Sequence, residues 1–276
     1  MPMSSATEPA VVFERVTLCR GARTILSEID FSLPRGGVTA VLGPSGAGKS
    51  TLLYGVVGEL VQAAGSIRVL GESLPRPHVR SLFDLRRKMG VMLQGNGLLS
   101  DLSVFENVAL PLRTHTDLPE PMIAELVRMK LAAVGLAEAA ELETSELSGG
   151  MARRVALARA VVTDPPLMLY DEPLTGLDPI ACGVIVNLIR RLNDALGMTS
   201  FVITHDVREI LPIADQVIIV ANRGIVFAGT PVALEASTDP LVRQFMDGTP
   251  DGPIGFDYRA TRQAVMAKDA GGRAHA

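Results

Sequence analysis

The stretch Leu147-Ser-Gly-Gly-Met151 decides how this chain is interpreted, because two other short segments flank it. Gly43-Pro-Ser-Gly-Ala-Gly-Lys49-Ser50 stands before it, and an apolar run that ends in Asp171-Glu172 stands after it. A glycine-rich loop that ends in a lysine and a hydroxyl side chain is typical of phosphate binding. Carboxylates at the end of a strand lie where ligands bind in α/β sheets. In this order the three segments predict a nucleotide-binding α/β protein.

The composition favours a compact protein with a large core, since 47% of the residues are hydrophobic and the mean hydropathy is +0.29. These values exclude the class of disordered chains with low hydrophobicity and high charge. The apolar residues come in strand-length runs, and none approaches the roughly 18 residues of a membrane-spanning helix. The N-terminus has no basic segment followed by an apolar one, so we expect no secretory signal and a cytoplasmic protein.

The net charge is −4, and acidic and basic residues are interspersed along the chain. There is thus no long basic stripe of the kind that follows a phosphate backbone, and we expect no nucleic acid partner. Cys19 and Cys182 are far apart, with neither metal-ligand spacing nor a neighbouring histidine. Both are expected to be buried, reduced thiols.

The hydrophobic pattern predicts strands that alternate with helices, which indicates a parallel sheet covered on both faces. Residues 11–18 and 25–33, divided by the turn-like Arg20-Gly-Ala-Arg23, are expected to form an antiparallel pair. The glycine-rich loop lies between a buried strand at 38–42 and a helix at 49–60, as a phosphate-binding loop requires. The other expected elements are strands at 90–93, 167–170, 199–204 and 216–220, helices at 151–162 and 179–196, and a hairpin return through Arg223-Gly224 to Phe227.

The middle of the chain has a different character, with a helical run at 122–134 among turn signals at Pro111, Pro119, Pro121 and Gly135. We interpret about 80–150 as a helical subdomain inserted into the α/β core. Core and insertion together are expected to form one domain at 11–247. Residues 248–276 are rich in Gly and Pro and then polar, so they are interpreted as an extension without a core of its own.

The glycine-rich loop is expected to hold a nucleotide with both its backbone and its side chains. The Lys49 ammonium reaches the β- and γ-phosphate oxygens, and the Ser50 hydroxyl binds Mg²⁺. Thr51 follows in the first helical turn, whose free N–H groups and dipole favour negative phosphates. The candidate phosphate-binding residues are Gly43, Pro44, Ser45, Gly46, Ala47, Gly48, Lys49, Ser50 and Thr51.

Four polar residues follow strands at the edge of the sheet where ligands bind in α/β proteins. We assign Asp171 to Mg²⁺ and Glu172 to the attacking water, which it activates as a general base. His205 follows the strand at 199–204 and is expected to contact the γ-phosphate as a donor. Gln94 follows the strand at 90–93, and its amide is expected to complete the Mg²⁺ coordination and to contact the water.

Ser148-Gly149-Gly150 opens the helix expected near residue 151 and so forms a second helix N-terminus suited to phosphate. One chain does not need two such sites for one nucleotide. We therefore expect a head-to-tail homodimer, in which each ATP lies between the Lys49 loop of one subunit and the Ser148 segment of the other. ATP would close this interface and hydrolysis would reopen it. Asp178 is expected at the same interface.

These segments, in this order, resemble the ATPase subunits of ABC transporters over about residues 11–247. The resemblance implies a parallel-sheet core with an antiparallel β subdomain and an inserted helical subdomain, with ATP and Mg²⁺ as cofactors. In the family's terms the segments are the Walker A, Q-loop, signature, Walker B, D-loop and H-loop elements.

Two residues depart from the pattern of this family. Met151 stands where Gln is commoner, and Arg20 stands where many relatives have an aromatic that stacks on adenine. The adenine-stacking residue thus stays open, although an arginine can also stack on a base.

Within that family the chain is similar to the ATPases of the MCE-type lipid transporters, the Mla system of bacteria. The stretches Pro111-Leu-Arg-Thr-His-Thr-Asp-Leu-Pro119 and Ser145-Glu-Leu-Ser-Gly-Gly-Met-Ala-Arg-Arg154 carry this resemblance, together with residues 178–180 and 242–253. It implies an ATPase dimer under two copies of an integral membrane permease, on the cytoplasmic side of the inner membrane. It also implies a periplasmic MCE-domain protein that handles phospholipid and, often, a STAS-domain protein beside the ATPase.

Two segments outside the motifs suggest contacts with partners. Residues 98–100 and 102–108 are apolar and partly helical and follow Gln94, so a permease's coupling helix is expected to dock there, although ordinary packing explains the same pattern. Phe256 and Tyr258 follow a turn-rich linker, which suggests a strap that docks onto another subunit.

Two other functions stay open. The same ATPase could drive an importer for another small solute, because the ATPase subunit of a transporter seldom contacts the cargo. A soluble ABC ATPase that acts on DNA or ribosomes is the third function. The chain lacks the long coiled-coil insertion of the DNA-repair type and the second ATPase core of the translation type, which argues against it.

Overall fold

The computed structural model describes residues 8–74 and 80–253. They form two compact units, of which the larger ends at Ala236 and the smaller begins at Ser237. The larger unit thus ends before residue 247, the boundary expected from the sequence. The described part of the smaller unit contains one helix, α9 (Pro240–Asp247), whose first turn is capped by the Asp239 carboxylate. Every candidate site residue lies in the larger unit.

The strands of the larger unit form two sheets, one of six strands in the order β10-β9-β3-β8-β7-β6 and one of four strands in the order β2-β1-β4-β5. The strands are β1 (Val11–Arg20), β2 (Arg23–Leu33), β3 (Val38–Leu42), β4 (Gln62–Val69), β5 (Glu72–Ser73), β6 (Met89–Met92), β7 (Leu167–Asp171), β8 (Thr199–Ile203), β9 (Gln216–Ala221) and β10 (Gly224–Gly229).

The six-stranded sheet confirms the parallel core expected from the sequence. Strands β9, β3, β8, β7 and β6 pair in parallel, and only β10 runs antiparallel, as the second strand of a hairpin with β9. Every residue of β3, β7 and β8 is buried. Strands covered on both faces are apolar along their whole length, which is why these three segments are continuous apolar runs in the sequence.

The four-stranded sheet is antiparallel, as expected for its first two strands. β1 and β2 are joined by a turn at Gly21-Ala22, and β1 also pairs with β4. Phe13 of β1 and Phe31 of β2 stack with ring centroids 4.4 Å apart in the core. Strand β1 therefore gives the sheet one apolar face, which packs toward the rest of the unit.

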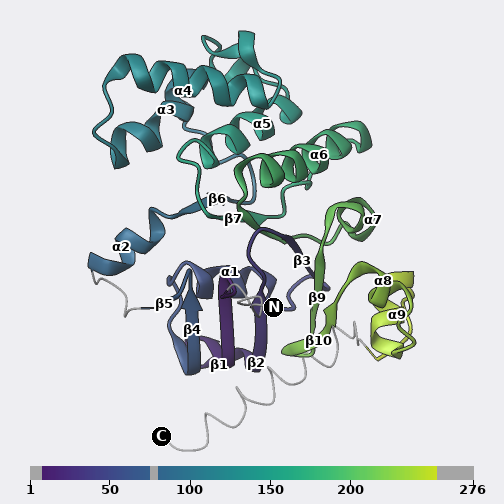
Figure 1. The fold of residues 1–276 in the computed structure, drawn as a ribbon. Coiled ribbons are helices and arrows are strands. Elements are labelled where there is room, and N and C mark those ends of the chain that lie inside the picture. The colour runs from purple at the N-terminus through teal and green to yellow at the C-terminus, as the bar shows by residue number, and fades with distance from the viewer. Residues whose placement is uncertain (1–7, 75–79, 254–276) are drawn as a thin grey trace, which may run out of the picture. The chain divides into compact units, whose positions relative to one another are not determined.

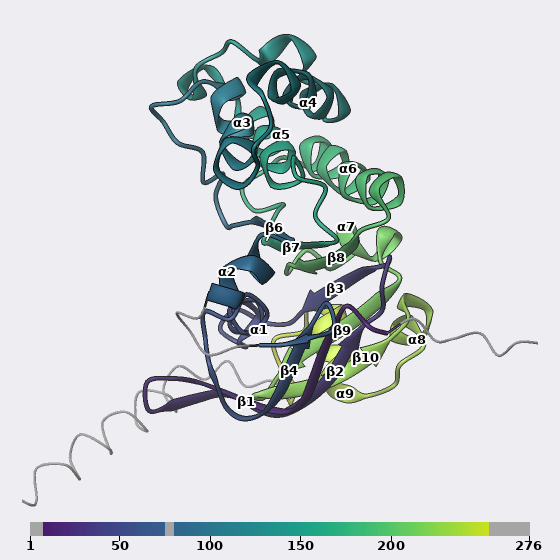
Figure 2. The same cartoon turned by 60° about the vertical axis from the view of Figure 1, so that its left-hand side comes forward.

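Helix α1 (Lys49–Val56) lies between the two sheets (Figures 1 and 2). Its Leu52, Leu53 and Val56 side chains belong to the same hydrophobic cluster as residues of both sheets. The helix was expected to continue to residue 60, and this was wrong. It ends early because Gly58 adopts a left-handed conformation (φ +66°), after which the Leu60 N–H bonds back to the Tyr54 carbonyl. This is a common way to end a helix.

The other helices of the larger unit lie between Arg80 and Glu235. They are α2 (Arg80–Arg86), α3 (Val104–His115), α4 (Glu120–Ala133), α5 (Gly149–Ala160), α6 (Pro179–Leu196), α7 (Val207–Ile210) and α8 (Pro231–Glu235), with 3₁₀ turns at Ala137–Ala139, Thr144–Glu146 and Leu211–Ile213. In both views α5 and α6 cover the face of the six-stranded sheet that is remote from the antiparallel sheet, and α3 and α4 lie beyond α5.

The range of about 80–150, interpreted as a helical subdomain, also includes β6. This strand pairs with β7 at the edge of the six-stranded sheet, so the insertion of helices into the core begins after Met92. The predicted helix near residue 151 begins earlier, at Gly149, because the Ser148 hydroxyl caps its first turn.

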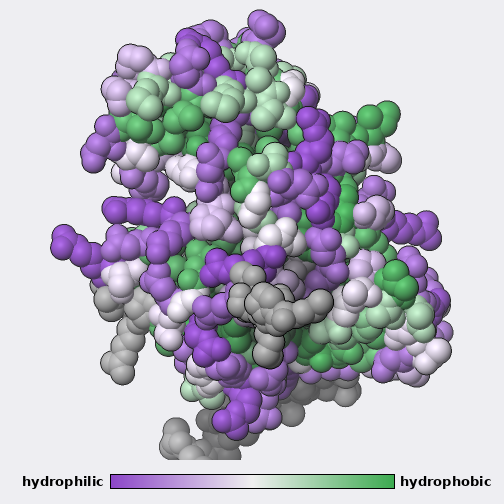
Figure 3. Space-filling model, viewed as in Figure 1, coloured by the Kyte–Doolittle hydropathy of each residue, from purple (hydrophilic) through white to green (hydrophobic). Residues whose placement is uncertain are grey.

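Hydrophilic and hydrophobic residues are mixed over the surface seen in Figure 3, and the hydrophobic ones form small separate groups. Among the described residues, no helix has both the length and the apolar character to cross a membrane. Both cysteines are free, as expected. Cys182 is buried, but Cys19 is only half-buried because the end of β1 reaches the surface.

Candidate nucleotide-binding and hydrolysis site

The glycine-rich loop begins where β3 ends, and its course depends on two glycines. Gly43 has φ +147°, and a Cβ atom there would lie 2.2 Å from the Val220 carbonyl oxygen of β9. Gly48 has φ +105° and stands at the N-cap of α1, where a Cβ atom would touch Ile25 and Leu26. A side chain at either position would be strained by its backbone conformation and crowded by its neighbours. The loop therefore needs glycine to turn from the sheet into the helix.

Lys49 is the first residue of α1, and its side chain folds back over the loop. The ammonium donates to the carbonyl oxygens of Gly43, at 2.8 Å, and Pro44, at 3.2 Å. Only 7% of Lys49 is exposed, and its Nζ lies 3.9 Å from Oε1 of Glu172. Burial lowers the pKa of Lys49, and the nearby carboxylates of Glu172 and Asp171 oppose this shift. The positive charge of Lys49 is therefore held inside the loop. In loops of this kind the same space surrounds a phosphate.

Asp171 is the last residue of β7, and it pairs with the second residue of α1. The Ser50 hydroxyl donates to Oδ1 of Asp171 at 3.2 Å. Burial raises the pKa of the Asp171 carboxyl, and the bond from Ser50 partly offsets the increase. A hydroxyl and a buried carboxylate are thereby held together beside the glycine-rich loop.

Glu172 follows directly and has an unusual backbone. Its φ is +52°, a left-handed conformation that costs a residue with a side chain about 1–2 kcal/mol. The conformation is held by the bond from the Glu172 N–H to the Ile203 carbonyl, at 2.8 Å. It directs the carboxylate to His205, whose Nδ1 lies 2.8 Å from Oε2 of Glu172. Strained residues of this kind are concentrated at functional sites.

A cavity of about 540 Å³ collects most of the residues that the sequence analysis assigns to phosphate, water and Mg²⁺. Gln94, which follows β6, reaches the same cavity, although it is far in sequence from the other lining residues. The lining contains Ser45, Gly46, Gly48, Lys49, Ser50, Thr51, Gln94, Glu172 and His205, together with Arg20, Arg23, Ile25 and Thr175. Asp171 does not line the cavity but contacts it through Ser50.

Four other candidate residues, Ser148, Gly149, Gly150 and Asp178, line a second cavity of about 590 Å³, whereas Gly43, Pro44 and Ala47 line neither cavity. The polar side chains there cap helices. The Ser148 hydroxyl accepts from the Met151 N–H of α5, and the Asp178 carboxylate accepts from two N–H groups of α6. The structure therefore does not bring the two groups of predicted nucleotide-binding residues together within one chain.

Arg23, Ile25 and Thr175 of the first cavity were not predicted as site residues, and Arg20 was named only as the residue that replaces a stacking aromatic. Arg20 lies over the ring of Tyr54, with its guanidinium carbon 5.1 Å from the ring centroid. Thr175 donates its hydroxyl to Oε2 of Glu172 over a longer distance of 3.5 Å. Cation–π pairs and contacts between loops depend on tertiary structure. The turn predicted at Arg20-Arg23 brings Arg23 and Ile25 to the glycine-rich loop. It was the one sequence feature from which their position at the site could have been predicted.

Possible metal ligands occur in two groups around this site. Ser50, Asp171 and Gln94 offer a hydroxyl, a carboxylate and an amide, which are the oxygen ligands that Mg²⁺ prefers. In the described part of the chain, Glu172, His205 and Asp206 also bring potential ligand atoms within 4.8 Å of one another. The Glu172 carboxylate in that group is already bonded to His205.

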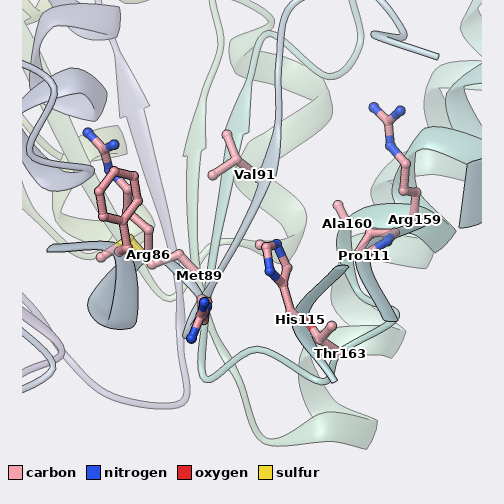
Figure 4. Close-up of a pocket in the computed structure, with 11 residues that line it drawn as sticks. Arg86, Met89, Val91, Pro111, His115, Arg159, Ala160 and Thr163 are labelled. Carbon is pink, nitrogen blue, oxygen red and sulfur yellow. The ribbon is translucent and has the colours of Figure 1, made fainter. Parts of the chain in front are cut away.

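A third cavity, of about 370 Å³, lies between α2 and β6 on one side and α3 and α5 on the other. Figure 4 shows Arg86 and Met89 on one side and Ala160 and Arg159 on the other, with the His115 ring between them. The cavity is lined by Phe83, Arg86, Arg87, Met89, Gly90, Val91, Pro111, His115, Arg159, Ala160 and Thr163. It combines an apolar lining with several basic side chains.

Comparison with known proteins shows the family and the fold of the chain. The model of the ABC transporter family matches residues 26–175, the segment from β2 through the loop after Glu172. The chain is 48% identical, over 94% of its length and 96% of the relative's, to the intermembrane phospholipid transport system ATP-binding protein MlaF of Escherichia coli K12.

Two solved structures have the same fold. One is cbiO1 of Clostridium perfringens, part of the ABC transporter complex cbiONQ, with a TM-score of 0.78, 28% identity and coverage of 88% of this chain and 96% of that one. The other is a dimeric post-hydrolysis state of an ATP-binding cassette bound to ADP and Pi, with a TM-score of 0.72, 27% identity and coverage of 80% and 98%. This chain therefore belongs to the ABC transporter family, as an ATP-binding subunit whose ATP hydrolysis is coupled to transport.

Proposed function

We propose that this ATPase drives the transport of phospholipids between the inner and the outer membrane. The observation that carries the proposal is the 48% identity, over nearly the whole of both chains, to a protein named for intermembrane phospholipid transport. The resemblance of residues 111–119 and 145–154 to the MCE-type transporters supports the same cargo. An identity of this extent reaches beyond the motifs that all ABC ATPases share.

Hydrolysis takes place in the 540 Å³ cavity. The N–H groups of the glycine-rich loop and of the first turn of α1 bind the phosphates, and the Lys49 ammonium exchanges its loop carbonyls for phosphate oxygens. Glu172 takes a proton from the water whose oxygen attacks the γ-phosphorus, and the bond to the β-phosphate oxygen breaks. Before ATP binds, His205 holds the Glu172 carboxylate through the 2.8 Å contact of its Nδ1. With ATP bound, it gives up this contact and donates its N–H to the γ-phosphate.

The residues around Ser50 fit Mg²⁺. The bond between Ser50 and Asp171 places two oxygen ligands together, and the buried Asp171 carboxylate is a suitable partner for a cation. Ser50, Asp171 and Gln94 are the residues that would hold the ion, directly or through water. When bound, Mg²⁺ neutralises charge on the β- and γ-phosphates.

The active form is a head-to-tail homodimer. The Ser148 segment and Asp178 lie in a cavity separate from the Lys49 loop, so a second chain is needed to bring both groups onto one ATP. The similar cassette that carries ADP and Pi is dimeric. ATP bound between the two surfaces joins the subunits, and loss of the γ-phosphate releases them.

The permease docks at the 370 Å³ cavity, which is lined in part by Gly90 and Val91 of β6. Of the residues at 98–100 and 102–108, expected as the docking site, Val104 and Val108 are fully buried, whereas Leu99 is 46% exposed. The neighbouring cavity is open, and Phe83, at 53% exposure, offers an apolar contact. Strand β6 lines this cavity and leads to Gln94, which lines the hydrolysis site, so it links docking to hydrolysis.

The remaining partners follow from the resemblance to the MCE-type transporters. They are an MCE-domain protein that handles phospholipid and a STAS-domain protein beside the ATPase, with the ATPase peripheral on the cytoplasmic side of the inner membrane. Phe256 and Tyr258, suggested to dock onto another subunit, lie outside the described residues. Truncation after Gly248 tests that suggestion, since unchanged dimerisation and ATPase activity would exclude it.

The proposal is tested by purifying the tagged protein from its native membranes in a gentle detergent and identifying the proteins and lipids that accompany it by mass spectrometry. A permease together with an MCE-domain protein and phospholipid is the expected result. A different permease would show an importer for another solute with the same hydrolysis site. Ribosomes or DNA in place of any membrane protein would contradict transport itself.

A further inference from the structure

Arg153 is a buried cation in the middle of α5, and it lines none of the three cavities described above. Only 4% of the residue is exposed. Its guanidinium donates to two backbone carbonyls, at 2.6 Å to Gly95 and at 2.9 Å to Thr175, whereas Nε has no partner. Burial lowers the pKa of the guanidinium. Burial of a charge without an opposite charge beside it lowers the stability of the folded protein.

The two carbonyls belong to the two loops that carry the candidate catalytic groups. Gly95 directly follows Gln94. Thr175 follows Glu172 in the loop after β7 and donates its own hydroxyl to the Glu172 carboxylate at 3.5 Å. Neither loop is part of a helix or strand at these positions, so neither carbonyl has a bond within a helix or sheet. The planar guanidinium has a rigid fork of donors. It therefore fixes the position of one loop relative to the other.

The same arginine is fixed to the Ser148 segment by its own helix. Ser148 caps α5, and Arg153 stands little more than one turn further along it. If the N-terminus of α5 is displaced, Arg153 moves with it, and the two loops to which its guanidinium is bonded move as well.

We propose that Arg153 is a positioning residue that connects the Ser148 surface to Gln94 and Glu172 of the same subunit. This inference rests on the proposed homodimer, in which Ser148 contacts the ATP held by the other subunit's Lys49 loop. Binding of ATP at one site then sets the position of Gln94 and Glu172 at the other site. Arg153 thereby couples the two ATP sites of the dimer.

The test uses the full-length protein in the membrane complex from which it is purified. Arg153→Met removes both hydrogen bonds but keeps an unbranched side chain of similar length. We expect kcat for ATP hydrolysis to fall roughly 10- to 100-fold, because small displacements of a catalytic group have effects of this size. The Kd for ATP, measured at equilibrium, should change less than about threefold, and the Hill coefficient for ATP should fall to about 1.

Arg190→Met is the matched control. Arg190 lies on α6 and likewise donates to a backbone carbonyl, that of Ile213, and to the carboxylates of Asp194 and Asp215, away from the cavities. Its loss should lower the melting temperature and leave kcat within about twofold of wild type. Arg153→Lys keeps the charge but has one nitrogen in place of a fork, so it should give an intermediate kcat.

A kcat of Arg153→Met within about threefold of wild type would overturn the proposal, and so would an equal loss in the Arg190→Met control. A variant that keeps the wild-type Hill coefficient would overturn the coupling of the two sites. If Arg153→Met does not fold, the folded Arg153→Lys protein decides: wild-type kcat overturns the proposal, and a lower kcat with unchanged Kd supports it. Failure of the dimer proposal is distinguishable, because wild-type protein would then remain monomeric with ATP.

Discussion

Two glycine-containing segments face nucleotide in the proposed dimer, and the chain needs them for different reasons. Gly43 is required by the fold of its own subunit, because a Cβ atom there would lie 2.2 Å from the Val220 carbonyl. Gly149 has no atom within 4 Å of a Cβ position, and its φ is not in the left-handed region. The fold of the single chain therefore gives no reason for a glycine at 149. A glycine that its own chain does not need points to close approach by something outside the chain.

The polar groups of the two segments differ in the same way. Around the Lys49 loop the side chains bond to one another: Ser50 to Asp171, Lys49 to loop carbonyls and His205 to Glu172. Around Ser148 the hydroxyl satisfies the N–H of its own helix. In the proposed mechanism the first surface carries the chemistry, and the second completes the site in the dimer. The predictions below separate these two roles.

Glu172→Gln should have the largest effect, since it removes the general base and leaves the Ser148 surface intact. We expect kcat to fall about 10²- to 10⁴-fold, the usual contribution of a base. Nucleotide affinity should be retained and an ATP-bound dimer should accumulate, which size-exclusion chromatography with ATP would detect. Normal turnover by this variant would reject the assignment of Glu172.

Lys49→Ala should act on binding itself. The ammonium is the buried cation of the loop, and its loss removes charge-assisted bonds to phosphate, so the affinity for ATP should fall roughly 10- to 100-fold. Equilibrium titration with a fluorescent ATP analogue measures this, and circular dichroism serves as the control for folding. Unchanged affinity would contradict the phosphate-binding role of the loop.

The two glycines give the most direct test of the comparison. Gly43→Ala should destabilise the protein by about 3 kcal/mol, because strain and a backbone clash combine at that position. Gly149→Ala should leave the melting temperature unchanged or higher, since alanine is the better helix former, yet lower ATP hydrolysis about tenfold by keeping the second subunit from the nucleotide. Thermal melting and ATPase assays on both variants check this. A fully active Gly149→Ala dimer would show that nothing approaches this glycine closely.

Much of the fold could be predicted from local sequence. Apolar runs such as 38–42 and 167–170 are buried strands because both faces of the sheet are covered, and the pattern of such strands needs no tertiary information. The loop between the first of these strands and α1 was predictable for the same reason, since its glycines and Lys49 are adjacent in sequence. The end of α1 was not predicted, because the left-handed turn at Gly58 competes with continued helical periodicity up to Leu60.

The candidate site was less predictable where its members come from distant elements. Gln94, Glu172 and His205 could be named because each follows a strand of one sheet, and parallel strands end at one edge. Arg153 and Thr175 could not, since their roles depend on two loops that meet beside α5. The strand expected at 90–93 is confirmed as β6, but only its pairing with β7 shows that it belongs to the six-stranded sheet and not to the helical insertion.

Arg20→Ala should have the smallest effect. It tests how the surface around the Lys49 loop binds the base of the nucleotide. The Tyr54 ring covers one face of the Arg20 guanidinium, and the residue lines the Lys49 cavity, so its other face is suited to stack on the adenine base. Loss of one such contact is worth about 0.5–2 kcal/mol, which corresponds to an increase in KM for ATP of roughly 2- to 30-fold with little change in kcat. Arg20→Tyr should retain a low KM because a ring can replace the guanidinium against the base. If Arg20→Ala left KM unchanged, the base would have to be bound by another residue of the cavity, with Ile25 and Arg23 as the next candidates.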